Sequence, residues 1–103
     1  MTKSLRHPNV RPSHPAEVIL LGIEESGVKK SDLARALGIS RNTLYNLLDQ
    51  RQSVTAEMAL RLEAVWGSTA EFWLRLQEQH DLWKARQSFD GSRLRRICTS
   101  TAT

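Results

Sequence analysis

The side chains best suited to contact another molecule gather in one short stretch of the sequence, residues 40–46. Arginine can donate two hydrogen bonds to guanine O6 and N7, and asparagine can pair with the adenine edge in a similar way. If the stretch is helical, its periodicity places the polar side chains opposite the apolar Leu44 and Leu47. The candidate base-contacting residues are Ser40, Arg41, Asn42, Thr43, Tyr45 and Asn46.

Basic side chains flank this stretch and suit contacts to a phosphate backbone. Residues 29–51 carry five basic and two acidic side chains, so the segment has a charge of +3. Cationic side chains gain affinity for nucleic acids by neutralising phosphates and releasing counterions. The amino end of a helix adds free amides and a positive dipole end. The candidate phosphate contacts are Lys29, Lys30, Arg35 and Arg51.

Two short helices joined by a glycine corner would hold these side chains in place. The apolar spacing predicts helices over residues 30–37 and 41–48, with Leu44, Leu47 and Leu48 on the buried face of the second. Gly38 is expected to turn with positive φ, Ile39 to fill the corner and Ser40 to cap the second helix. A helical hairpin of no special function has similar spacing. The arginine-bearing outer face favours the DNA-binding helix-turn-helix, whose second helix enters the major groove.

Two further helices are predicted on either side of this pair. One begins at Pro15, which suits a first helical turn, and ends at Gly27. The other spans residues 56–66, with Thr55 as its cap.

A fifth helix is predicted over about residues 69–86. Ser68 and Glu71 are expected to form a capping box at its start. For Trp73 we expect a place in the core, with a dimer interface as the alternative, because aromatic residues are enriched in both. The helix carries the aromatic residues Phe72, Trp73 and Trp83.

The chain of 103 residues, 40% of them hydrophobic, suits a single all-α domain of five helices. We expect an extended arm over residues 1–13, the helical domain over 14–86 and a flexible basic tail over 87–103. The net charge of +4 favours a polyanionic partner. A single cysteine, Cys98, excludes an intrachain disulfide, and neither a membrane span nor a signal peptide is visible, so a cytoplasmic location is expected.

The sequence offers little support for catalysis or metal binding. The three histidines lack the paired spacing of metal ligands, and no motif presents an activated nucleophile. We therefore expect neither an enzyme, nor a metal site, nor a cofactor.

Several segments resemble the HigA antitoxin family, a branch of the lambda-repressor-like helix-turn-helix proteins. The resemblance covers roughly residues 11–86. Its most specific parts are the opening motif at 11–17 and the last motif at 71–83. The matching segments are 11–17, 33–41, 55–62, 71–77 and 81–83.

The resemblance implies a homodimer that binds inverted repeats in the promoter of its own operon. It also implies a toxin partner of the HigB type, a small basic protein of the RelE-like fold that cleaves messenger RNA. Residues 52–80 carry two basic and four acidic side chains and are one place where a basic toxin would bind. The acidic residues are Glu57, Glu63, Glu71 and Glu78. The alternative function is a phage-type repressor that acts without a toxin.

Two positions depart from the family pattern. Members often have Ser or Thr as the helix cap where this chain has Lys29, and Asp32 in the first turn is expected to compensate through the helix dipole. Members also often have an Asn-Gly turn after the recognition helix. This chain has Asp49-Gln50-Arg51 there, which predicts a different loop.

Overall fold

The computed structural model describes residues 11–97. These residues form five α-helices and no strand, which confirms the predicted all-α fold. His7, Cys98 and most of the predicted arm lie outside the described range. The helices are α1 (Pro15–Ser26), α2 (Lys30–Leu37), α3 (Arg41–Leu48), α4 (Ala56–Trp66) and α5 (Ala70–Ser88).

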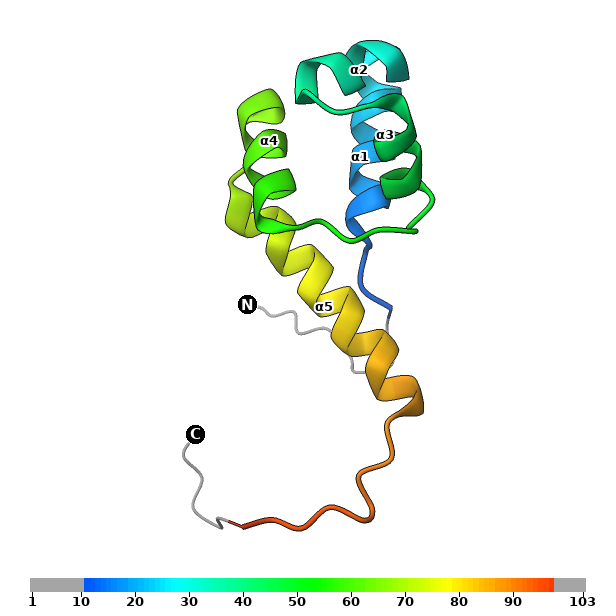
Figure 1. The fold of residues 1–103 in the computed structure, drawn as a ribbon, viewed down its shortest axis with the longest axis vertical. Helices are drawn as coiled ribbons and strands as arrows, with labels where there is room; N and C mark the ends of the chain where they lie inside the picture. Colours follow the sequence, from blue (N-terminus) through cyan, green and yellow to red (C-terminus); the bar gives the residue numbers. More distant parts are fainter. Residues whose placement is uncertain (1–10, 98–103) are drawn as a thin grey trace.

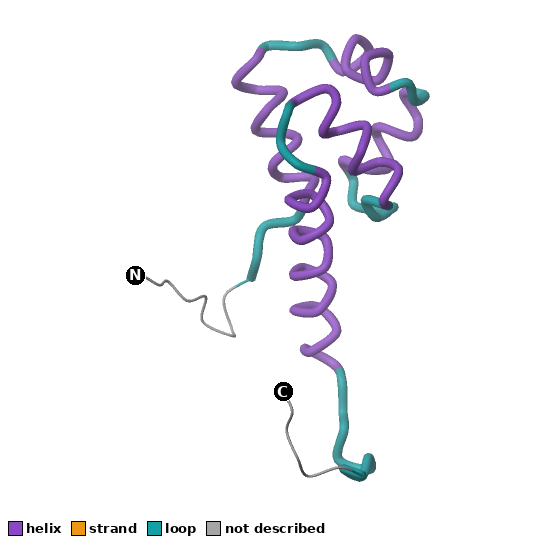
Figure 2. The backbone as a smooth tube through the Cα atoms, turned by 90° about the vertical axis from the view of Figure 1, so that its left-hand side faces the viewer, coloured by secondary structure: helices purple, strands orange, loops and turns teal. Residues whose placement is uncertain are grey.

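Four helices form a head, and α5 projects from it (Figure 1). Helices α1 and α3 lie side by side, with α2 across one end and α4 on the opposite side of the head. The amino-terminal part of α5 packs against α4 and α1, whereas its carboxyl-terminal part continues away from the head (Figure 2). Among residues 11–97, no helix combines the length and the apolarity that crossing a membrane requires.

All five helices contribute side chains to one hydrophobic core. Its largest fully enclosed members include Ile19 of α1, Leu44 and Leu47 of α3, Leu62 of α4 and Trp73 of α5. Burial of each such aliphatic side chain stabilises the fold by about 1.5–3 kcal/mol. The core position expected for Trp73 is confirmed, since its side chain is 2% exposed and packs beside Phe72 and Trp66.

Helix α3 is bounded by the expected cap at its start and by a left-handed turn at its end. Ser40 caps it as predicted, but Leu48, expected on the buried face, is only partly buried. The chain then turns through Gln50, whose φ of 62° lies in the left-handed region. The amides of Gln50 and Arg51 donate to the carbonyls of Leu47 and Asn46, as in a Schellman motif. A left-handed non-glycine residue costs about 1–2 kcal/mol, which this packed turn must offset.

The predicted cap of α5 is wrong by one residue. The side chain of Thr69, and not of Ser68, accepts the hydrogen bond from the amide of Phe72 at 3.1 Å. Glu71 does not complete a capping box. Instead, Glu63 of α4 accepts from the amide of Ala70 at 3.1 Å. A carboxylate from another helix therefore satisfies a free amide at the start of α5, where the local spacing pointed to Glu71. The helix also ends later than predicted, at Ser88.

A capping box does occur, at the start of α1. His14 Nδ1 accepts from the amide of Ala16 at 2.9 Å, and the Glu17 carboxylate accepts from the amide of His14. Arg11 holds that carboxylate at 2.8 Å. The ring of His14 packs edge-on against His80 of α5, with the centroids 4.7 Å apart. The cap therefore also joins α1 to α5.

Only neutral His14 can accept this bond, so we predict an acid-sensitive fold. Burial lowers the pKa of His14 from its ordinary value of 6.5, and the nearby His80 lowers it further, against the carboxylates of Asp81 and Glu17. A lowered folded-state pKa means that His14 contributes its full stability above pH 6.5 and loses it as the pH falls toward the folded-state value. The free energy of unfolding should thus fall between neutral and mildly acidic pH.

His14→Asn tests this, because asparagine is a good helix cap that does not titrate. Denaturant unfolding at several pH values should give a shallower acid dependence for the variant than for the wild type. All other titrating groups are present in both proteins, so the difference between the curves reports His14 together with its coupling to His80, Asp81 and Glu17. Parallel curves would show that His14 does not control the acid dependence.

Candidate nucleic-acid interface

The start of α3 is fixed by two hydroxyl groups that bind each other. Ser40 Oγ accepts from the amide of Thr43 at 3.0 Å and donates to Thr43 Oγ1 at 2.9 Å. Both hydroxyls belonged to the predicted base-contacting set. Their mutual hydrogen bonds make them supports for the helix start, each with acceptor capacity left for a further donor.

Arg41 and Asn42 follow directly and point their functional groups away from the fold. Both are exposed, and neither side chain hydrogen-bonds to any residue within 11–97. The apolar side chains of Leu44 and Leu47, on the other side of the helix, are fully buried. The expected opposition of a polar and an apolar face on this helix is therefore confirmed.

Tyr45 and Asn46 occupy the next turn but differ in accessibility. Tyr45 is 45% exposed, and the Lys30 ammonium lies 5.9 Å from its ring centroid, within the range of a weak cation–π contact. The structure thus brings Lys30 of α2 to the outer face of α3. Asn46 is partly buried. Its backbone carbonyl accepts from the amide of Arg51, and this hydrogen bond fixes Arg51 at the end of the helix.

Lys29 and Arg35 are also exposed, but neither forms a side-chain hydrogen bond to α3. Arg35 lies 3.4 Å from Asp32 in an ion pair with 81% and 52% of the side chains exposed. Such a pair is weak enough for Arg35 to exchange its partner for a phosphate. Asp32 lies in the first turn of α2, as its expected compensating role requires, and the missing cap at Lys29 is confirmed.

Two long-range supports of this region were missed from the sequence. Arg61 of α4 donates to the backbone at the corner between α2 and α3. Gln77 of α5 is buried, and its Oε1 accepts from the amide of Val54 at 2.8 Å while its Nε2 donates to Asp81. Gln77 thereby ties the loop after α3 to α5. The only local signal was the spacing of Gln77 and Asp81, one helical turn apart.

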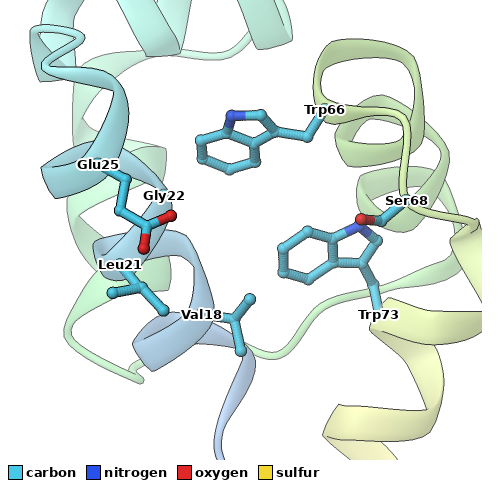
Figure 3. A pocket seen from close by; sticks show the side chains of 7 residues that line it. All are labelled: Val18, Leu21, Gly22, Glu25, Trp66, Ser68 and Trp73. Atoms are coloured by element: carbon cyan, nitrogen blue, oxygen red, sulfur yellow. The ribbon is translucent and has the colours of Figure 1, made fainter.

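A separate hollow of about 210 Å³ lies between α1 and the turn from α4 to α5 (Figure 3). Trp66 and Trp73 form one wall, and Gly22 of α1 lies opposite them. The absence of a side chain at Gly22 makes room for the Trp66 ring, since a Cβ there would lie only 3.0 Å from that ring. None of the predicted DNA-contacting residues lines this hollow, so it is distinct from the outer face of α3. Its lining residues are Val18, Leu21, Gly22, Glu25, Trp66, Ser68 and Trp73.

Comparison with known proteins relates this arrangement of helices to a protein family. A model of the Cro/C1-type HTH DNA-binding domain matches residues 23–62. The chain is 36% identical to Antitoxin HigA-1 of Vibrio cholerae over 86 residues, covering 82% of this chain and 81% of that protein. It is also 36% identical to the HTH-type transcriptional regulator YddM of Escherichia coli K12 over 97 residues, covering 94% and 98% of the two chains.

A solved structure agrees with this relationship. The antitoxin GraA in complex with its operator superposes with a TM-score of 0.76 at 37% sequence identity. The match covers 96% of this chain and all of that one. The likeness therefore includes the projecting α5 as well as the head.

If Arg41 contacts a base edge, Arg41→Ala should weaken binding to a preferred DNA sequence by about 1–3 kcal/mol and relax the preference in each half-site. The residue is exposed and its side chain makes no hydrogen bond within the described part of the chain, so the substitution should leave the fold unchanged. Fluorescence anisotropy against a duplex selected by the protein from a random library measures the effect. An unchanged affinity would remove Arg41 from the binding face.

Lys30→Ala is the matched comparison, because a phosphate contact carries no sequence information. It should weaken selected and unselected duplexes by the same factor and lower the slope of log affinity against log salt by about one. A loss confined to the selected duplex would instead place Lys30 at a base.

Proposed function

The chain belongs to the HigA antitoxin family of Cro/C1-type helix-turn-helix proteins, and on that basis we propose that it represses its own operon and neutralises a toxin encoded beside it. The observation that carries the DNA half is the outer face of α3, where Arg41 and Asn42 are exposed and have no side-chain partner among residues 11–97. Lys29, Lys30, Arg35 and Arg51 supply the cations for the phosphate backbone. The target is an inverted repeat with half-sites one helical turn apart, each bound by one copy of α3.

A homodimer is part of this proposal, because one eight-residue recognition helix contacts too few base pairs for useful discrimination. The carboxyl-terminal part of α5 is the face that best fits a second copy. It leaves the head (Figure 2), and Leu82 is 46% exposed. Leu82 and Ala85 line an open groove together with Val54 and Leu74, which form its apolar strip, while Gln77, Glu78 and Asp81 supply its polar lining.

Leu82→Glu should therefore dissociate the dimer. A two-fold interface contains the substituted residue twice, so losing the burial of two leucines should weaken association at least about 100-fold. Sedimentation velocity at micromolar concentration measures this. Leu60→Glu is the control, since Leu60 of α4 is 57% exposed outside this strip. A wild type that stays monomeric with and without DNA would contradict the dimer.

The toxin half of the proposal rests on the family and on charge. A nuclease that binds messenger RNA should be basic, and it needs a surface that is not the cationic DNA face. Of the four glutamates considered for this role, two already contact other residues of this chain. Glu57 pairs with Arg61 at 2.9 Å, and Glu63 accepts from the start of α5. Glu71 and Glu78 are exposed without a side-chain partner among the described residues, but Glu78 lines the α5 groove assigned to the second copy, so Glu71 is the candidate.

Co-expression tests the antitoxin function. The neighbouring reading frame for a small basic protein should arrest growth when expressed alone and be harmless when expressed with this chain. The two products should also co-purify. A harmless neighbour, or one that does not co-purify, would leave the alternative of a repressor without a toxin.

Charge reversal at Glu71 then tests the placement of the toxin surface. Glu71→Lys should slow association at low salt by about threefold or more while leaving dissociation nearly unchanged, because long-range attraction acts on encounter. Glu24→Lys on α1 is the matched control of equal charge. An equal effect of both variants would place the toxin elsewhere.

A further inference from the structure

Arg61 projects from α4 onto the corner between α2 and α3. Its Nη1 donates to the carbonyl of Leu37 at 2.8 Å and lies 3.3 Å from the carbonyl of Gly38. Its Nη2 donates to Glu57 one turn earlier on α4, at 2.9 Å. The guanidinium thus spans two elements that are more than twenty residues apart in the sequence.

The corner itself supplies no backbone amide to either of these two carbonyls. Helix α2 ends in a Schellman motif, in which the amides of Gly38 and Ile39 donate to the carbonyls of Arg35 and Ala34. The carbonyls of Leu37 and Gly38 come after these and have no amide partner within the helix. Arg61 satisfies them from outside. It also places a full positive charge at the negative end of the α2 dipole.

Gly38 is matched to this arrangement in two ways. Its φ of 72° favours glycine, and a Cβ built on it would lie only 2.7 Å from Arg61 Nη1. The corner therefore requires glycine for the guanidinium to approach as well as for the turn. Glu57 accepts from the other terminal nitrogen, Nη2, and thereby fixes the orientation of the Arg61 guanidinium.

We propose that Arg61 is a positioning residue for DNA recognition: it fixes the direction in which α3 leaves the corner. The chain runs only from Gly38 to Ser40 between the clamped carbonyls and the cap of α3. A change in the corner therefore shifts the leading end of the helix, which carries Arg41 and Asn42. The inference rests on the proposed binding of DNA by α3.

This role differs from that of a phosphate-contacting arginine. Both terminal nitrogens of Arg61 are engaged within the protein, and its side chain is 37% exposed. Loss of a phosphate contact weakens binding to every sequence and lowers the salt slope by about one. Loss of orientation instead weakens binding to the preferred sequence, since only base contacts need α3 to be aligned.

The test compares Arg61→Met with Arg75→Met, which removes an equal charge from an exposed position on α5. Each full-length variant is titrated against the duplex that the wild type selects from a random library and against an unrelated duplex of equal length. For Arg61→Met, the ratio of the two affinities should fall about tenfold, the effect of misplacing one bidentate base contact. The salt slope on the unrelated duplex should equal that of Arg75→Met.

Arg61→Lys and Glu57→Gln extend the test to variants that should disturb the fold less. Thermal melting followed by circular dichroism checks that each variant is folded. Lysine keeps the charge but not the planar fork, so the ratio should fall by about threefold or more. If Arg61→Met does not fold, the result for Arg61→Lys decides. A wild-type ratio in the folded variants, or an equal loss on both duplexes with a lower slope, would overturn the proposal. A wild type without sequence preference would overturn the proposed function as well.

Discussion

The burial of Leu44 and Leu47 is the interaction on which the rest of the structure depends. Helix α3 has only eight residues, and a helix of that length is not stable alone in water. Both leucines are fully buried, in a core built by the other four helices. Because the apolar face of α3 is held so firmly inward, its polar face must point outward. The binding face is thus a consequence of core packing.

The ends of α3 are held as firmly as its buried face, by groups from three different parts of the chain. Ser40 caps the start, a turn through Gln50 closes the end, and Gln77 of α5 binds the loop that follows. Few of these contacts use the outer side chains of α3. Apart from Ser40 and Thr43, the residues that hold the helix therefore differ from those whose side chains are free to bind a ligand.

Local signals in the sequence were enough to predict the helices. Gly38, Ser40 and Thr55 stand at the helix boundaries predicted for them, because caps and left-handed turns depend on residues close together in the chain. The capping box was predicted at the wrong helix. Ser68 and Glu71 match its spacing, but a carboxylate from α4 takes the place of Glu71, and a histidine forms the box at α1. Neither Arg61 nor Gln77 was foreseen, since each binds backbone more than twenty residues away. The toxin partner was predicted only through family resemblance, because no local pattern encodes it.

The central claim is that the outer face of α3 binds DNA, and NMR tests it most directly. An amide chemical-shift titration of the labelled protein with the selected duplex should give the largest changes at the start of α3, from Ser40 to Asn46. Smaller changes are expected at Lys29, Lys30, Arg35 and Arg51, and almost none at the buried Leu62 and Trp73 or along the exposed end of α5. Shifts concentrated in residues 89–97, with α3 unaffected, would contradict the claim.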